Sequence, residues 1–89
     1  MKNLTLGDVR KRIQSMMETF MMLGVTVESL QEFSELCGSV GSEIKKEYNV
    51  STLEQLRILS DETILSEVIF DKYLELDRWI ENNQGPIKN

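Results

Sequence analysis

Apolar residues recur at intervals of three and four positions along most of this chain, and this spacing constrains the fold more than any other feature. The longest regular row consists of Leu30, Phe33, Cys37, Val40, Ile44 and Tyr48. Residues at these intervals lie on one face of an α-helix, whereas a β-strand places every second residue on one face. No segment alternates in that way between turn signals. The sequence therefore predicts an all-α fold.

Start and stop signals divide the apolar rows into helices. Thr5 and Asp8 form a capping-box pair, and Gly24 is a typical helix terminator, so we expect a helix over residues 5–23. Its inward row consists of Leu6, Val9, Ile13, Met16, Met17, Phe20 and Leu23. Thr26 is the predicted N-cap of a second helix, over residues 27–48.

Two further helices follow. Asn49 ends the second helix, and the capping-box pair Ser51 and Glu54 opens a short one with three leucines facing inward. Ser60 is the predicted N-cap of the last helix, which ends in the stop signal of residues 82–86. The inward row of this last helix consists of Leu65, Ile69, Tyr73, Leu76 and Ile80.

Two glycines leave open whether the second helix is broken over residues 38–42. A glycine in a helix interior costs about 1 kcal/mol relative to alanine, so Gly38 and Gly41 favour a break. The apolar row nevertheless keeps its phase on both sides of them, which favours one continuous helix. Gly41 also falls on the apolar face, so we expect another helix to approach it closely.

Together these elements predict a compact bundle of three long helices and one short helix. The chain has 89 residues, enough for a single small domain, which we expect over residues 1–83 with a frayed tail over residues 84–89. No apolar run could span a bilayer, no signal-peptide pattern is found at the N-terminus, and the single cysteine fits a reducing compartment. We therefore expect a cytoplasmic protein.

The residue types exclude several kinds of catalytic site. The chain contains no histidine, which removes His-based catalysis and the usual zinc ligand sets. Glu32 and Glu35, together with Glu67 and Asp71, are candidates for a magnesium site. However, the second pair is one residue too long for a Glu-x-x-Asp motif, and the first pair lies on the outward face. Cys37 lies in an apolar row, which favours a packed thiol. We expect no enzymatic activity, no cofactor and no metal.

The net charge of −5 is unevenly distributed, because residues 13–44 contain no lysine or arginine. Glu28, Glu32 and Glu35 form an acidic ridge on the second helix, which is either a solvated face or a partner-binding surface that could include phosphate mimicry. The basic residues are candidates for nucleic-acid contacts: Arg10, Lys11, Arg12, Lys45 and Lys46. A helix-turn-helix with its turn at Gly38 would have as many glutamates as lysines over residues 42–48, which disfavours DNA binding.

Three apolar residues fall outside the inward rows. Met22 points away from the apolar stripe of the first helix, and Phe70 and Leu74 emerge opposite the inward row of the last helix. A helix that is apolar on both sides is either central in the fold or covered by another chain. We expect a non-catalytic module that binds another protein as an adaptor or inhibitor, with a homodimer as one form of that contact. The alternative is a helical DNA-binding transcriptional regulator that uses the five basic residues.

Overall fold

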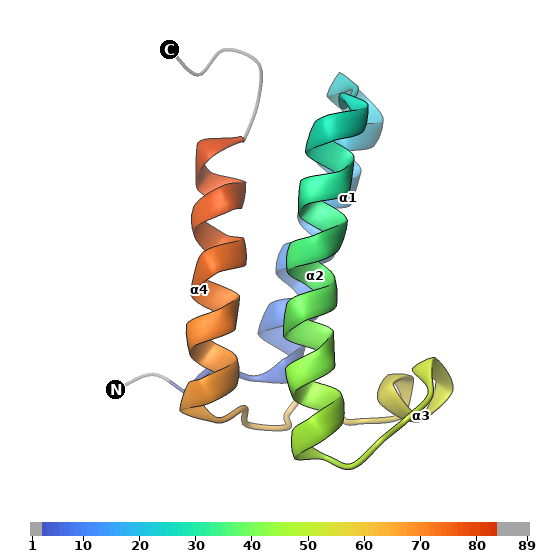
Figure 1. The fold of residues 1–89 in the computed structure, drawn as a ribbon, viewed down its shortest axis with the longest axis vertical. Coiled ribbons are helices and arrows are strands. Elements are labelled where there is room, and N and C mark those ends of the chain that lie inside the picture. Colours follow the sequence, from blue (N-terminus) through green and yellow to red (C-terminus); the bar gives the residue numbers. More distant parts are fainter. Residues whose placement is uncertain (1–2, 84–89) are drawn as a thin grey trace.

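The computed structural model of the protein describes residues 3–83 and contains four helices (Figure 1). They are α1 (Leu6–Leu23), α2 (Val27–Glu47), α3 (Leu53–Arg57) and α4 (Glu67–Asn82). In the described range, the β-type contact is a single antiparallel bridge between Thr5 and Ile64. The predicted all-α bundle of three long helices and one short helix is therefore confirmed. The predicted tail over residues 84–89 lies outside the described residues.

The three long helices run along the length of the molecule, with α2 antiparallel to α1 and α4 (Figure 1). Helix α4 packs along α2 and also contacts α1, so it has neighbours on two sides. The core between the helices contains Leu6, Val9, Met16, Phe33, Val40, Ile44, Leu65, Ile69, Leu76 and Ile80. All ten belong to the predicted inward rows. In the part of the chain that the structure describes, no helix has the length and apolar character required to cross a membrane.

Local geometry confirms the predicted boundaries of the first two helices. The Thr5 hydroxyl accepts a hydrogen bond from the Asp8 backbone N–H at 3.2 Å, and the Asp8 carboxylate accepts one from the Thr5 N–H at 3.1 Å. Thr26 caps the start of α2 in a similar way, through its hydroxyl. Gly24 and Asn49, which follow α1 and α2, have φ angles of 85° and 53°. Positive φ angles favour these two residue types at helix ends.

Helix α2 runs without a break through Gly38 and Gly41, as the phase of its apolar row predicts. The expected close approach of another helix at Gly41 is wrong, because a β-carbon built at either glycine would have no neighbouring atom within 4 Å. The helices that cover α2 pack against the stripe that contains Phe33, Val40 and Ile44. The two glycines therefore cost helix stability without allowing any tight packing.

The short helix α3 begins one residue later than predicted. Its N-cap is Thr52 rather than Ser51, and the Thr52 hydroxyl accepts a hydrogen bond from the Gln55 N–H at 3.1 Å. The Gln55 side-chain oxygen in turn accepts hydrogen bonds from the N–H groups of Ser51, at 2.8 Å, and Thr52, at 3.4 Å. Thr52 and Gln55 have the same spacing as Ser51 and Glu54, and the glutamine satisfies two backbone donors at once. This is why the later cap is adopted.

The last helix also begins later than predicted, at Ser66 rather than Ser60. The Ser66 hydroxyl accepts a hydrogen bond from the Ile69 N–H at 3.4 Å and caps α4. Residues 60–65 form a turn and a short extended stretch instead of a first helical turn. In that turn, the Thr63 N–H donates to the backbone oxygen of Ser60 at 3.0 Å. The predicted start of the last helix is therefore wrong by six residues.

The start of α1 explains why residues 60–65 are not helical. Three backbone hydrogen bonds join the two segments: Leu6 N–H to Thr63 O (2.8 Å), Gly7 N–H to Asp61 O (2.8 Å) and Leu65 N–H to Leu4 O (2.9 Å). The first N–H groups of a helix have no partner within that helix. The carbonyl groups of residues 61 and 63 satisfy two of them, one from the turn and one from the non-helical residues that follow it. The tertiary contact thus overrides the local helix signal at Ser60.

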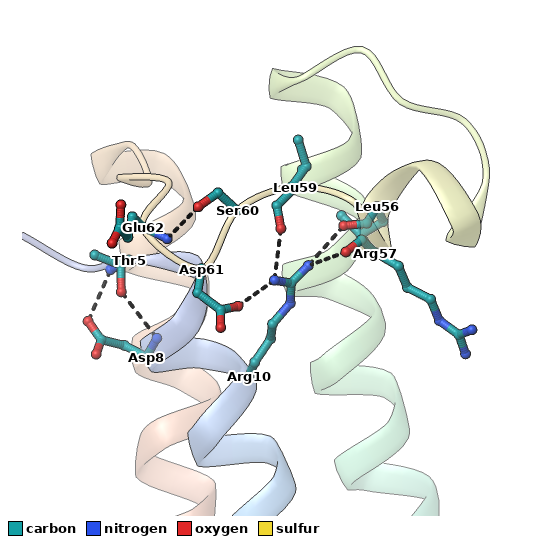
Figure 2. Close-up of polar contacts among 9 residues, drawn as sticks. All are labelled: Thr5, Asp8, Arg10, Leu56, Arg57, Leu59, Ser60, Asp61 and Glu62. Atoms are coloured by element: carbon teal, nitrogen blue, oxygen red, sulfur yellow. Dashed lines mark hydrogen bonds and ion pairs between the residues drawn. The ribbon is translucent and has the colours of Figure 1, made fainter.

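Arg10 fastens α3 to the same region (Figure 2). Its guanidinium donates hydrogen bonds to the backbone oxygens of Leu56, at 3.0 Å, and Leu59, at 2.9 Å. It also forms an ion pair with the Asp61 carboxylate. Carbonyl groups at the C-terminal end of a helix lack partners within the helix, and an arginine side chain can satisfy them. Because no side chain of α3 is fully buried and only Leu56 packs partly buried against the core, these bonds from Arg10 are a principal tie between α3 and α1.

We expect Gly7→Ala to destabilise the fold. A β-carbon at residue 7 would lie 2.9 Å from both the β-carbon and the backbone oxygen of Asp61. That backbone cannot retreat without losing the hydrogen bonds to the start of α1. Overpacking of this kind lowers the free energy of unfolding by about 1–3 kcal/mol. Urea denaturation monitored by circular dichroism measures the change.

Gly41→Ala is the matched control for this prediction. Its new β-carbon meets no atom within 4 Å, and alanine is favoured over glycine in a helix interior by about 0.5–1 kcal/mol. We therefore expect the two Gly→Ala substitutions to change stability in opposite directions. A Gly7→Ala protein as stable as the unsubstituted chain would contradict the tight contact between α1 and Asp61.

Candidate functional site

Large apolar side chains gather at the corner between α1 and α2. We call this surface the apolar tip and define it as Met21, Met22, Leu23, Val25 and Val27. Both methionines are 83% exposed, and Val27 is 74% exposed. Figure 1 shows the reason: the corner extends beyond the end of α4, so α4 does not cover it. Scattered exposed apolar residues are ordinary, but a contiguous apolar surface usually marks a contact site.

Short-range signals place these residues in the corner. The N–H of Gly24 donates to the backbone oxygen of Phe20 at 2.8 Å and ends α1, and Thr26 caps α2 only two residues later. The chain must therefore reverse direction within residues 24–26. Met17 and Leu23, predicted to face inward, are 44% and 54% exposed, so this part of the prediction is wrong. Near the C-terminal end of α1, Phe20 is the residue of the inward row that packs against the core, whereas Leu23 is exposed.

Sequence analysis identified Met22 but not the rest of the apolar tip. A signal was present, because residues 19–27 contain no charged residue at all. Helical periodicity alone does not identify this segment as a surface, because Leu23 fits the inward row and Val25 and Val27 flank the cap at Thr26. These residues are exposed because α4 ends short of the corner. Helical periodicity does not predict where α4 ends relative to the corner.

A hollow lies beside the apolar tip, where α1 and α2 meet the end of α4. This end hollow has a volume of about 430 Å³ and is lined by Phe20, Leu23 and Val25 on its apolar side. Ser29 from α2 and Asn83 from the end of α4 add polar groups to its wall. With Thr19 and Thr26, four of the eight lining residues are polar, so the hollow offers hydrogen-bonding groups beside its apolar wall.

Three aromatic rings, one from each long helix, lie next to the end hollow. Phe20 contacts Phe33 edge-to-face with ring centroids 5.3 Å apart, and Trp79 lies 5.6 Å from Phe33 and 6.2 Å from Phe20. Such pairs contribute about 0.5–1.5 kcal/mol each beyond the burial of their area. The cluster ties the three helices together at this end, so the surface above it rests on a packed base.

The acidic ridge predicted on α2 is exposed, but its members differ in their contacts. Glu32 accepts a hydrogen bond from the indole Nε1–H of Trp79 at 2.8 Å, which joins α2 to α4. Glu32 and Glu35 also line a second hollow of about 420 Å³, together with Trp79 and Leu36. We call this the acidic hollow. Glu28 is exposed in the first turn of α2, next to the apolar tip.

Phe70 and Leu74, also predicted as contact residues, lie elsewhere. Phe70 is 39% exposed in the first turn of α4, and Leu74 is half-buried one turn later. Phe70 borders two cavities of about 560 and 370 Å³, which it shares with Asn3 and Leu4. Since α1 and α4 begin at the same end of the molecule, Phe70 is at the opposite end from Met22 (Figure 1). The predicted apolar contact residues therefore form two separate surfaces.

Three of the five basic residues considered for nucleic-acid contacts, Arg10, Arg12 and Lys46, make polar contacts within the chain. Arg12 forms ion pairs with Asp77 at 3.0 Å and Glu81 at 2.6 Å, both on α4. Partial burial alone would lower the pKa of Arg12, but the hydrogen bond to Glu81 and the charge of Asp77 raise it. Lys46 lies 3.7 Å from Glu43 on α2. With Arg10 bound to α3, the triplet of residues 10–12 points toward several elements rather than forming one patch. The turn considered at Gly38 is absent.

The acidic pairs considered for magnesium do not come together. Glu32 and Glu35 lie beside Trp79, near the end of α4, whereas Glu67 and Asp71 are in its first turn and a half. Twelve residues of helix separate Glu67 from Trp79, a rise of about 18 Å. Within residues 3–83, no group of three or more His, Cys, Asp or Glu side chains is arranged to hold a metal ion.

Cys37 is half-buried against the core, and burial raises the pKa of its thiol to about 11. The thiolate is the reactive form, so we expect slow modification of Cys37 by a disulfide reagent near pH 8. The rate should climb as the pH rises toward 11, and unfolding in urea should abolish the protection. Modification at pH 8 as fast in the folded as in the unfolded chain would contradict this environment for the thiol.

Comparison with known proteins adds no assignment to these surfaces. No family model matches the chain, and no match was found among curated proteins or solved structures. What the apolar tip and its two hollows bind is therefore inferred from the side chains that form them, from their exposure and from their charge.

Proposed function

We propose that this chain is a non-catalytic helical module that binds another protein through its apolar tip and so acts as an adaptor or inhibitor. The observation that supports this proposal is the exposure of five apolar side chains at one end of the bundle, two of which, Leu23 and Val25, line a hollow. Leaving them in water is unfavourable, and a partner that covers them would remove that cost.

The energetics of the apolar tip suit a binding surface. Fully burying a Met, Val or Leu side chain that starts exposed contributes about 1.5–3 kcal/mol. Methionine side chains are flexible and adapt to the shape of a partner. The backbone beneath them is already held by the caps at Gly24 and Thr26 and by the aromatic cluster, so little backbone conformational freedom is lost on binding.

The position of Phe70 favours an adaptor over a simple inhibitor. Phe70 and its two neighbouring cavities lie at the opposite end of the bundle from the apolar tip. A molecule with two separated contact surfaces can hold two proteins at once, whereas an inhibitor needs only one. In this scheme the helices act as a rigid spacer between the two contacts.

The test is capture of partners with a variant of the apolar tip. We expect the double substitution Met21→Ser and Met22→Ser to leave the fold intact, because both side chains are 83% exposed. The same substitution should weaken capture of a specific partner from source-cell lysate by roughly tenfold or more, as is usual for central contact residues. Quantitative mass spectrometry measures the captured proteins.

Ile58→Ser is the matched control, because Ile58 is 82% exposed but lies at the end of α3, away from the apolar tip. It should capture the same partner as the unsubstituted chain. Sedimentation of all three proteins shows whether the contact is with a second copy instead. Equal capture by the double variant and by the control would contradict binding through the apolar tip.

A further inference from the structure

We propose that the occupant of the apolar tip is an amphipathic segment of a partner protein whose apolar residues cover the tip and whose lysine or arginine enters the acidic hollow. This inference rests on the proposed function and specifies the chemistry of the partner. Three observations support it: the two hollows adjoin, this end of the bundle carries excess negative charge, and the lining of the acidic hollow suits a long basic side chain.

The two hollows lie one helical turn apart. On α2, Ser29 lines the end hollow and Glu32, three residues later, lines the acidic hollow. On α4, Asn83 lines the first and Trp79, four residues earlier, lines the second. The Asn83 side chain donates a hydrogen bond to the backbone oxygen of Trp79 at 2.8 Å. One turn corresponds to about 5 Å, so neighbouring side chains of one bound segment can reach both hollows.

The charges at this end select a basic partner. Residues 14–37 contain four glutamates and no lysine or arginine: Glu18, Glu28, Glu32 and Glu35. A second copy of the chain docked tip to tip would bring these carboxylates together, which is unfavourable. Nucleic acids and anionic membranes would be repelled in the same way. A segment that carries positive charge beside its apolar residues is attracted at long range and remains paired once bound.

The lining of the acidic hollow fits a lysine or arginine side chain. Glu35 supplies a carboxylate for the cation, and Glu32 retains acceptor capacity because a carboxylate has about four acceptor positions and only one is used by Trp79. The Trp79 indole offers a π-system that attracts cations. Leu36 can cover the aliphatic stem of the side chain, as apolar surface commonly does for lysine and arginine.

Trp79 also makes the inference testable, because it is the single tryptophan of the chain and lines the acidic hollow. Its fluorescence can be followed while short synthetic peptides are added to the whole 89-residue chain. Three peptides serve as probes: an amphipathic leucine–lysine helix, the same helix with glutamate in place of lysine, and the same helix with serine in place of leucine. We expect only the leucine–lysine peptide to bind well, with an affinity about tenfold or more above the other two.

Substitution of Glu35 locates the cation. Glu35→Gln should weaken binding of the leucine–lysine peptide by roughly two- to fivefold, the effect of one partly exposed ion pair. Glu54→Gln is the matched control, because Glu54 is an exposed carboxylate in the first turn of α3 and lines neither hollow. It removes the same charge and should leave the affinity unchanged. Glu32 is unsuitable, since its loss would disturb the Trp79 signal directly.

Several outcomes would overturn the inference. Equal binding of the leucine–glutamate peptide would show that the tip selects no charge, and equal weakening by Glu35→Gln and Glu54→Gln would show attraction by net charge alone. Binding of none of the peptides, or self-association that the Met21 and Met22 substitutions abolish, would show another occupant. The peptide results do not bear on whether the apolar tip binds a protein, which the capture and sedimentation experiments decide separately.

Discussion

The contact between the start of α1 and the segment that precedes α4 sets the arrangement of the whole chain. Carbonyl groups of Asp61 and Thr63 satisfy the first N–H groups of α1, and Gly7 permits the backbones to approach this closely. Arg10 adds α3 to the same junction by donating hydrogen bonds to the carbonyl groups of Leu56 and Arg57. The junction joins the beginnings of α1 and α4, and both helices run away from it in the same direction. Helix α2 starts at the far end of α1 and runs back toward the junction (Figure 1).

The uncovered end of the bundle follows from this arrangement. Helix α4 starts at the junction and ends at Asn82, short of the corner between α1 and α2 (Figure 1). The aromatic cluster of Phe20, Phe33 and Trp79 closes the core at the level where α4 ends. The apolar residues beyond it have no helix to pack against. The junction and the surface around Phe70 thus lie at one end of the molecule, and the apolar tip and the acidic hollow lie toward the other.

Local signals in the sequence predict most of the helices, and long-range contacts account for what they miss. The caps at Thr5 and Thr26 and the inward rows depend on residues at most four positions apart, so the sequence reveals them. Ser60 has the local signals of a helix start. Residues 60–65 are nevertheless not helical, because the carbonyl groups of Asp61 and Thr63 accept hydrogen bonds from the first N–H groups of α1. The bond between Glu32 and Trp79 joins residues 47 positions apart, and periodicity cannot reveal it. The hollows, which depend on where three helices end, are hidden for the same reason.

The central claim is that the apolar tip is open to solvent in the unbound protein and is therefore available to a partner. Nuclear magnetic resonance of methionine methyl groups, with a soluble paramagnetic agent in the solvent, tests this most directly. Met21 and Met22 should be strongly broadened, whereas Met16, which is 2% exposed in the core, should be protected. Protection of Met21 and Met22 equal to that of Met16 would contradict the claim, because the tip would then already be covered.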